Sequence, residues 1–581
     1  MEDLLFPEGV CDMEKARIPV GEENFELLRK KKSYYVDKTR FIVELLEEDF
    51  KVNLITRPRR FGKTLNMSML EAFFDIRKDS KDIFEGLEIM GYEELCAEWM
   101  NQWPVISISF KDVANDNFED SYEQMALDLA GLCVEHAYLL ESVHTDADDK
   151  DRFARLKAGK ATEAELRNSL FIIARMMYAH YGKPVILLID EYDVPLAKAS
   201  EYGYYPKMLN VIRSMMSTSF KTNRFLQFAV VTGCLRIAKE SIFTGANNFK
   251  SNSIAGSHYL DSFGFTEREV EQMLEDTGQL TRLSRIKQWY DGYHFGKYDI
   301  YCPWDVSNYV SDVLREPDKI LGNYWKDTSH NNIIRQFVGK DGMDVNDKFE
   351  KLLSGGSIRS RLTEDSTYCF ENAAEEDFWS ILYFTGYLTI DRSRGKSDSG
   401  EVILKIPNKE IKTIFGDTIV EWFQETIGIK AAERREMFAA WWDGDDKTVA
   451  DAVSIILNDA ISYYDYKEDY YHAFVAGLFS GAGYLVTSND ENGLGRADVV
   501  VKDQKTRKVI IVEVKHSDSE DEMEKDCRKA LQQIDLKKYA SRYLNGYKAV
   551  QCYGAAFFQK KCLIRKVTVP GAGKGSVFKL E

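Results

Sequence analysis

The sequence predicts an α/β protein whose first part is built on a parallel β-sheet. Short apolar runs such as "VNLIT" and "FLQFAVVTG" alternate with longer stretches of helical periodicity, and strands that alternate with helices favour a parallel sheet. Residues 185–189 form a continuous apolar run, which is typical of a strand buried on both faces. These two observations predict the fold class before any motif is considered.

The expected elements of this first part follow one another from about residue 18 to residue 237. A turn and a helix, 34–49, carry an apolar face made by Phe41, Ile42, Leu45 and Leu46. The predicted strands are 52–55, 103–110, 185–189 and 225–237, and the predicted helices between them include 65–74 and 165–182.

Three further parts are predicted, which gives the domain boundaries 1–237, 238–330, 331–445 and 446–581. The second part is helical and lid-like, and Thr266 with Glu269 indicates an approximate capping box at a helix start. The third is helical with a small winged segment, formed by "FWSILYFTGYLTIDRS" and "VILKIPNKEI" around a turn. The fourth has helices, two strands around a polar turn within 497–516, and a final helix.

The composition is that of a folded globular protein without a membrane segment. A length of 581 residues suggests three to four domains as a prior, and no apolar run approaches the roughly 20 residues of a membrane helix. The acidic N-terminus lacks the features of a signal peptide, and nine scattered cysteines without a C-x-x-C pair argue against structural zinc. We therefore expect a cytoplasmic protein, and the sequence leaves homo-oligomerisation open.

The net charge of −17 does not point to nucleic-acid binding, which favours a basic face. A local basic groove can still bind DNA while the rest of the surface is acidic. Basic clusters occur at 29–32 and 57–60. For the first of them, solvated surface lysines are the better explanation.

The stretch "RPRRFGKT" (57–64) ends like a phosphate-binding loop. Gly62, Lys63 and Thr64 match the pattern G-x-x-x-x-G-K-[ST], and the stretch follows an apolar strand and opens a helix. Backbone N–H groups at the helix start would point at phosphate oxygens, Lys63 would reach the β- and γ-phosphates, and Thr64 would ligate Mg²⁺. We therefore expect ATP and Mg²⁺ here. The alternative is a basic turn that happens to end in GKT.

The second half of the expected nucleotide site lies in "LLIDEYD". Asp190 would hold Mg²⁺ through water, and Glu191 would orient the attacking water. A polar loop start would explain such a pair if it stood alone. Thr232 stands where a side chain would contact the γ-phosphate, although a plain strand end explains it nearly as well. Arg236 would supply positive charge in cis or to a neighbouring subunit.

Arg57 departs from the motif because it replaces the first glycine, which normally permits an unusual backbone angle. Pro58 restricts the loop further. ATP binding is therefore better supported than fast hydrolysis. The expected nucleotide-binding residues of the loop are Arg57, Arg59, Arg60, Phe61, Gly62, Lys63 and Thr64.

A second site is predicted in "GRADVVV" and "VIIVEVK". Glu513 and Lys515 are two positions apart and share one face of a strand, and Asp498 can meet them across a hairpin. Charges on a strand otherwise full of valine and isoleucine need a reason, because buried unpaired charge is costly. Mg²⁺ held by Asp498, Glu513 and the carbonyl of Val514 would be sufficient, with Lys515 positioning the attacking water or stabilising phosphate charge.

The alternative for this pattern is an ordinary glutamate–lysine pair on the exposed face of an amphipathic hairpin. Glu468 on the preceding helix would be a further metal ligand or polar support, and Gln533 on the following helix would orient the site. A purely structural role explains each of these two residues equally well.

Together these motifs resemble a known bacterial family. The D…E-V-K constellation resembles the PD-(D/E)XK nuclease superfamily, and "YYVDKTRFI", "RPRRFGKT", "LIDEYDVPL", "SIFTGANN" and "WYDGYHFG" look like bacterial AAA-ATPase-like proteins that carry such a nuclease domain at the C-terminus. The resemblance covers nearly the whole chain. It implies an ATPase core, helical and winged-helix segments, and a restriction-endonuclease-like fold. The arginine-rich loop is then this family's form of the phosphate loop.

The leading hypothesis is an ATP-dependent or ATP-regulated, Mg²⁺-dependent nuclease that acts on nucleic acid, with DNA favoured over RNA. One alternative is an ATP-switched scaffold whose nuclease-like domain binds nucleic acid without cutting. Another is a nucleotide sensor that uses slow hydrolysis as a timer. The resemblance also suggests phage defence or mobile-element biology.

Overall fold

The structure is a computed structural model, and it divides into two compact units, each considered by itself. The first comprises residues 1–330 with 359–410, and the second comprises 331–358 with 411–581. The four-part division drawn from the sequence stays a prediction. The structure describes residues 17–237, 242, 249–325, 348, 351–352, 355–364, 368, 374–394, 400–415, 431–460, 468–481, 485–492, 495–503, 506–543 and 546–570, some of them in the second unit by backbone alone.

The first unit contains a five-stranded sheet in which every pair is parallel, as the sequence predicts. The four predicted strands are present, and a fifth, β5, was not predicted. β5 is short and polar, so it lacks the apolar run of the others. The spatial order is β2 (Val105–Ser109), β3 (Val185–Asp190), β4 (Leu226–Gly233), β1 (Val52–Thr56), β5 (Phe249–Asn252).

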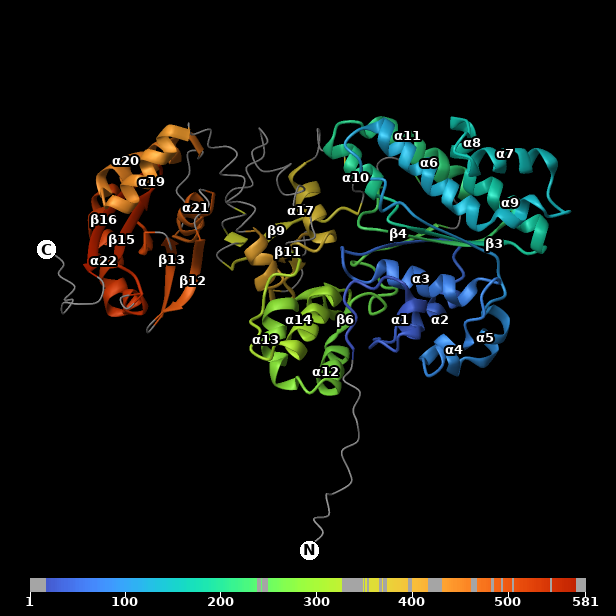
Figure 1. The fold of residues 1–581 in the computed structure, drawn as a ribbon, viewed down its shortest axis with the longest axis horizontal. Helices are drawn as coiled ribbons and strands as arrows, with labels where there is room; N and C mark the ends of the chain where they lie inside the picture. The colour runs from blue at the N-terminus through green and yellow to red at the C-terminus, as the bar shows by residue number, and fades with distance from the viewer. Residues whose placement is uncertain are drawn as a thin grey trace, which may run out of the picture. The chain divides into compact units, whose positions relative to one another are not determined.

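Helices cover both faces of this sheet (Figure 1). The predicted helix 165–182 is divided in two at Asn168, because a capping box between Thr162 and Glu165 starts a separate short helix. One face carries α1 (Phe25–Lys30), α2 (Arg40–Glu47), α3 (Lys63–Phe74), α4 (Lys81–Phe84) and α5 (Glu93–Trp99). The other carries α6 (Phe118–Glu135), α7 (Ala147–Lys157), α8 (Glu163–Arg167), α9 (Ser169–Tyr181), α10 (Val194–Glu201) and α11 (Tyr205–Phe220).

A small antiparallel sheet follows in the same unit, with the order β6 (Phe265–Thr266), β8 (Tyr298–Tyr301), β7 (Tyr293–Phe295). It is accompanied by α12 (Glu267–Asp276), α13 (Leu283–Tyr290) and α14 (Pro303–Arg315). The capping box predicted at Thr266 and Glu269 is confirmed, since each side chain bonds the backbone of the other. The apolar faces of these helices pack together around Tyr290, Tyr301 and Tyr309.

The winged segment predicted in the third part is a helix followed by a β-hairpin. α17 (Glu375–Phe384) precedes β10 (Thr389–Ile390) and β11 (Val402–Lys405), which pair antiparallel, and β9 (Ile358–Ser360) adds a third strand beside β11. Most of the predicted turn 396–401 lies outside the described residues. Residues 359–410 group with the first unit.

The second unit contains a mixed five-stranded sheet, of which the sequence predicted the two strands within 497–516. β14 and β15 pair in parallel, and the other pairs are antiparallel. The order is β12 (Leu485–Asn492), β13 (Gly495–Asp503), β14 (Lys508–His516), β15 (Ala549–Phe558), β16 (Lys561–Pro570). Its helices include α19 (Ala431–Asp443), α20 (Asp446–Ala460), α21 (Glu468–Gly481) and α22 (Met523–Leu536).

In the part of the chain that the structure describes, no helix combines the length and apolarity needed to cross a bilayer.

Candidate active sites

The residues of the expected nucleotide site meet at one edge of the parallel sheet. β4 lies between β1 and β3 and pairs in parallel with both, so the carboxyl ends of the three strands lie side by side. The loop after β1 therefore faces Asp190 at the end of β3, with Thr232 on β4 between them. Sequence segments more than a hundred residues apart form one site in this way.

Asp190 is the central acceptor of this site. Thr64 Oγ1 donates a hydrogen bond to Asp190 Oδ2 at 2.7 Å, and Thr232 Oγ1 donates to Oδ1. Burial, with the neighbouring Glu191, raises the pKa of the Asp190 carboxyl. A buried carboxylate beside the hydroxyl of the GKT threonine is a donor set suited to Mg²⁺, which prefers oxygen ligands.

Lys63 is held in place by the loop itself. Its ammonium donates to the carbonyl oxygens of Arg57 and Pro58 at 3.3 and 3.2 Å and lies 3.3 Å from Glu191 Oε1. Glu191 has a φ of 52°, a conformation that non-glycine residues rarely adopt. Gly62, directly before Lys63, has a φ of 84° with open space around the position of a Cβ. The start of α3 thus offers room for an anion.

Arg57 does not face this space. Its guanidinium is fully buried and donates hydrogen bonds to four carbonyl oxygens, those of Thr56, Asn252, His258 and Tyr259. Burial without a carboxylate partner lowers the pKa of Arg57 to about 9. The side chain therefore braces the loop against β5 and the segment after it. It was expected to bind the nucleotide, and its contacts are structural instead.

The other expected loop residues lie in three different surroundings. Phe61 is buried and packs edge-on against Tyr293, with ring centroids 5.0 Å apart, so the small antiparallel sheet anchors the loop. Arg59 is half-buried, which by itself lowers the pKa of its guanidinium, but Cys234, Tyr368 and Glu191 raise that pKa overall. Arg60 stacks on Trp304 at 3.8 Å.

Arg236, expected to supply positive charge, has an acidic partner. Its guanidinium is 3.7 Å from the carboxylate of Glu364, which also accepts a hydrogen bond from Ser253. An acidic partner in the same unit thus already holds the charge that was expected to act in cis or on a neighbouring subunit.

Asp193 is a site residue that the sequence did not single out. Its buried carboxylate accepts hydrogen bonds from the backbone N–H groups of Cys234 and Leu235, each at 3.0 Å, and from the Tyr368 hydroxyl at 3.0 Å. Burial raises the pKa of Asp193 to about 6. Its position after "IDEY" was visible, but its partners come from segments remote in sequence.

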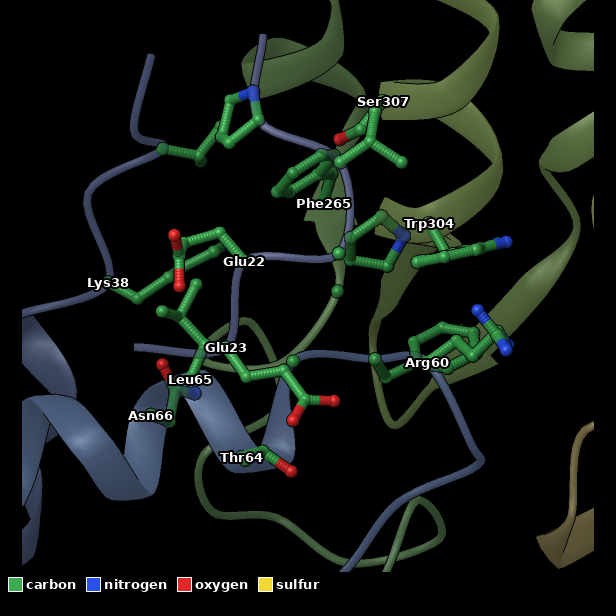
Figure 2. A pocket seen from close by; sticks show the side chains of 18 of the residues that line it. Glu22, Glu23, Lys38, Arg60, Thr64, Leu65, Asn66, Phe265, Trp304 and Ser307 are labelled. Atoms are coloured by element: carbon green, nitrogen blue, oxygen red, sulfur yellow. The ribbon is translucent and has the colours of Figure 1, made fainter. Parts of the chain in front are cut away.

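A cavity of about 490 Å³ opens at the phosphate loop (Figure 2). Gly62, Lys63, Thr64 and Glu191 line one end of it. The remaining walls include residues 18–23, residues from 34–38 and 262–265, and the start of α14. The expected nucleotide-binding residues therefore border a cavity.

The second predicted site forms on the sheet of the second unit. Asp498 on β13 accepts a hydrogen bond from the backbone N–H of Val514 at 2.9 Å, which fixes it beside the E-V-K segment of β14. Glu513 is fully buried, accepts a hydrogen bond from Gln533 on α22, and lies 3.6 Å from the Lys515 ammonium. Four of the expected residues are thus brought together, and the exposed glutamate–lysine pair is not what the structure shows.

The donor set at this second site suits a hard cation with few protein ligands. Within the described residues no group of three or more His, Cys, Asp or Glu side chains is placed to hold a metal. A cation here would rest on Asp498, Glu513 and the Val514 carbonyl, completed by water. Mg²⁺ commonly binds through one or two carboxylates and keeps several waters, so the residues fit it.

Two regions of the chain match models of known protein families. Residues 19–243 match a family described as a predicted AAA-ATPase, and residues 466–567 match the PD-(D/E)XK nuclease superfamily. The chain combines an AAA-ATPase-like domain with a PD-(D/E)XK nuclease-superfamily domain. A protein of Azotobacter chroococcum mcd 1, described as an uncharacterized protein in vnfD 5'region, is 23% identical over 558 residues, which cover 94% of this chain and 97% of that protein. The predicted resemblance is confirmed for the two matched regions.

The nuclease-superfamily domain also holds site residues that were not predicted. His472 on α21 donates from Nε2 to the carbonyl oxygen of Asp498 at 2.6 Å, and the buried Tyr539 hydrogen-bonds with Gln533. His472 follows two tyrosines and Tyr539 follows two lysines in sequence, and neither pattern gave a signal of the role of these residues. Glu468 is the first residue of α21, but its side chain lies outside the described residues, so its expected role stays a prediction.

Proposed function

We propose that this protein binds and hydrolyses ATP in its first unit and cleaves DNA in its second unit with Mg²⁺, under the control of the nucleotide. The observation that carries the proposal is the assembly of Asp498, Glu513, Lys515 and Gln533 on adjacent strands and a helix. An amide and a lysine hold this buried carboxylate in place. A role in phosphodiester hydrolysis explains this arrangement better than a purely structural ion pair does. The biological setting, phage defence or mobile-element biology, stays a prediction of the resemblance.

At the nucleotide site, bound ATP and Mg²⁺ would supply the phosphate and the charge that polarises it. Thr64 and Asp190 would hold the cation, because their hydrogen bond places hydroxyl and carboxylate together. Lys63 would bind phosphate oxygens, and Glu191, its present partner, would then be available to orient water.

At the nuclease site, Asp498, Glu513 and the Val514 carbonyl would hold Mg²⁺, which supplies Lewis-acid chemistry when bound. Lys515 would stabilise negative charge on the scissile phosphate or position water. Gln533 holds one oxygen of Glu513 and so orients the carboxylate.

Control by the nucleotide is supported by the segment 359–410. Within the first unit this segment touches the phosphate site, through Tyr368 at Asp193 and Glu364 at Arg236. The chain then continues directly into the second unit at residue 411. A nucleotide that fits only one arrangement of these contacts would shift the population of states.

The test is plasmid cleavage by the full-length protein with Mg²⁺, with and without ATP. We expect cleavage that changes with ATP, a loss of at least about 100-fold in Glu513→Gln, and unchanged ATP hydrolysis in that variant. Glu520→Gln is the matched control, since Glu520 is an exposed acid of the same unit that pairs with Lys561. Glu191→Gln should bind ATP but hydrolyse it slowly.

Two outcomes would contradict the proposal. Cleavage that survives Glu513→Gln would come from another source. Absence of cleavage of DNA and RNA under every nucleotide condition, with ATP and Mg²⁺ still bound, would favour the non-cleaving, ATP-switched scaffold.

A further inference from the structure

The cavity at the phosphate loop extends well beyond the residues that would hold phosphates. Its volume of about 490 Å³ falls within the roughly 300–1,000 Å³ typical of small-molecule sites. Lys63 supplies positive charge at one end, whereas the far walls are largely apolar. A ligand that fits therefore has an anionic end and a flat, apolar end. The apolar lining comprises Ile18, Pro19, Val20, Phe265, Met273 and Trp304.

Arg60 belongs to the phosphate loop in sequence but to the apolar wall in space. With a φ of 71° it adopts a strained backbone conformation, and its guanidinium lies 3.8 Å from the centroid of the Trp304 ring. Trp304 is itself fixed, because its indole N–H donates to the carbonyl of Tyr324 at 3.1 Å. Figure 2 shows Arg60 and Trp304 on one side of the cavity, with Glu22 and Glu23 on the other and Thr64 at one end.

The charges along the cavity fix the direction of such a ligand. Glu22 and Glu23 lie along the wall formed by residues 18–23, where they disfavour phosphate. They are paired with Lys31 at 2.8 Å and Lys111 at 3.1 Å. The anionic end therefore belongs at Lys63, and the flat end at the wall of Arg60 and Trp304.

We propose that the Arg60–Trp304 stack holds the purine base of a nucleoside triphosphate whose phosphates lie at Lys63. Guanidinium and aromatic planes both stack on nucleobases. Asn308 lines the same wall, and its amide nitrogen already donates to the Trp304 carbonyl at 2.8 Å. Its amide oxygen is thus the atom that accepts a hydrogen bond from a base amino group. This inference rests on the proposed nucleotide function and adds a base-recognition role for a phosphate-loop arginine.

The experiment compares ATP with inorganic tripolyphosphate in calorimetric titrations of the full-length protein. Wild type should bind ATP at least about 10-fold more tightly than tripolyphosphate, since stacking contributes roughly 1–3 kcal/mol per base. Arg60→Lys keeps the positive charge but removes the planar guanidinium, and Trp304→Leu removes the indole ring. Each should weaken ATP binding about 10-fold and leave tripolyphosphate binding unchanged. Arg224→Lys is the matched control, because Arg224 stacks on Phe225 at 5.0 Å outside the cavity.

Three results would overturn the inference. Equal affinity of wild type for ATP and tripolyphosphate would show that the base is not recognised, while the phosphate site stands. If Arg60→Lys weakened the affinity for ATP and for tripolyphosphate equally, Arg60 would contact the phosphates and not the base. Binding of neither ligand by wild type would refute the nucleotide site itself and the base site with it. Arg60 is partly exposed, so Arg60→Lys should fold even if Trp304→Leu does not.

Discussion

In the AAA-ATPase-like domain the lysine and glutamate of the expected site come from two segments that are remote in sequence, whereas in the nuclease-superfamily domain they belong to one strand. Lys63 and Glu191 lie 3.3 Å apart and start from segments that follow β1 and β3. Glu513 and Lys515 lie 3.6 Å apart and are two residues apart on β14. Alternation along a strand places the second pair by local geometry alone. The first pair depends on remote segments that hold the loops.

The sharpest way to use this difference is to remove each lysine in turn. Lys515→Met should lower DNA cleavage by about 10²–10³-fold, the scale seen when one charge-stabilising donor is lost, and leave ATP affinity unchanged. Lys63→Met should abolish ATP binding. Cleavage rates and ATP titrations measure both. Lys548→Met, at an exposed position of the second unit, is the control, and a loss of ATP affinity in Lys515→Met would contradict the separation of the two sites.

A substitution of Arg57 tests whether the phosphate loop depends on contacts with segments that are remote in sequence. Arg57→Met keeps the volume but leaves four buried carbonyl oxygens without their donor. We expect the opening of β5 and residues 253–259 to become easier by about 3 kcal/mol, because buried polar groups that lose a partner cost roughly 1–3 kcal/mol. Hydrogen exchange of those amides measures this, since the two units need not unfold together.

For Arg57→Met, the exposed Arg285→Met serves as the control. Unchanged exchange in β5 would show that the guanidinium does not brace the loop. ATP affinity should fall together with the local stability, because the loop that carries Lys63 begins at Arg57.

We expect acid to destabilise the first unit around His136 but not the sheet of the second unit, and this effect is smaller. Burial, with the nearby Arg77, lowers the pKa of His136 to about 4 from an ordinary value of 6.5. The folded protein favours the neutral imidazole of His136. The contribution of this residue to the stability of the fold is therefore complete above pH 6.5 and is lost as the pH falls towards 4. The loss should reach about 2–3 kcal/mol, at 1.36 kcal/mol for each unit of pKa.

Hydrogen exchange of α6 at pH 7 and pH 4.5 measures this loss. His136→Gln should make exchange in α6 less dependent on pH and leave β14 unaffected. An identical pH dependence in wild type and variant would rule out His136 as the source.

The sequence predicted the parts of both sites that follow from short-range periodicity. The apolar runs gave four of the five strands of the parallel sheet, and the spacing of Asp498, Glu513 and Lys515 gave their convergence. Gly62, Lys63 and Thr64 were singled out because a known pattern fixes their spacing, and Asp190 was singled out because it ends an apolar strand. Such features need only local rules.

What the sequence did not predict depends on contacts between distant segments. The carbonyl partners of Arg57 lie about two hundred residues away, at Asn252, His258 and Tyr259. Tyr368 reaches Asp193 from a segment whose packing on the first unit was not expected. β5 was missed because its four residues, "FKSN", carry no apolar pattern.

The hydrogen bonds of the buried Arg57 guanidinium determine how the phosphate loop responds to salt. Its charge is satisfied by fixed carbonyl dipoles in the interior, where dissolved ions do not reach, so raising the ionic strength should leave the phosphate loop intact. Binding of a nucleic-acid backbone releases counterions and weakens steeply with salt. Concentrated salt should therefore weaken the proposed binding of nucleic acid while the phosphate loop keeps its conformation.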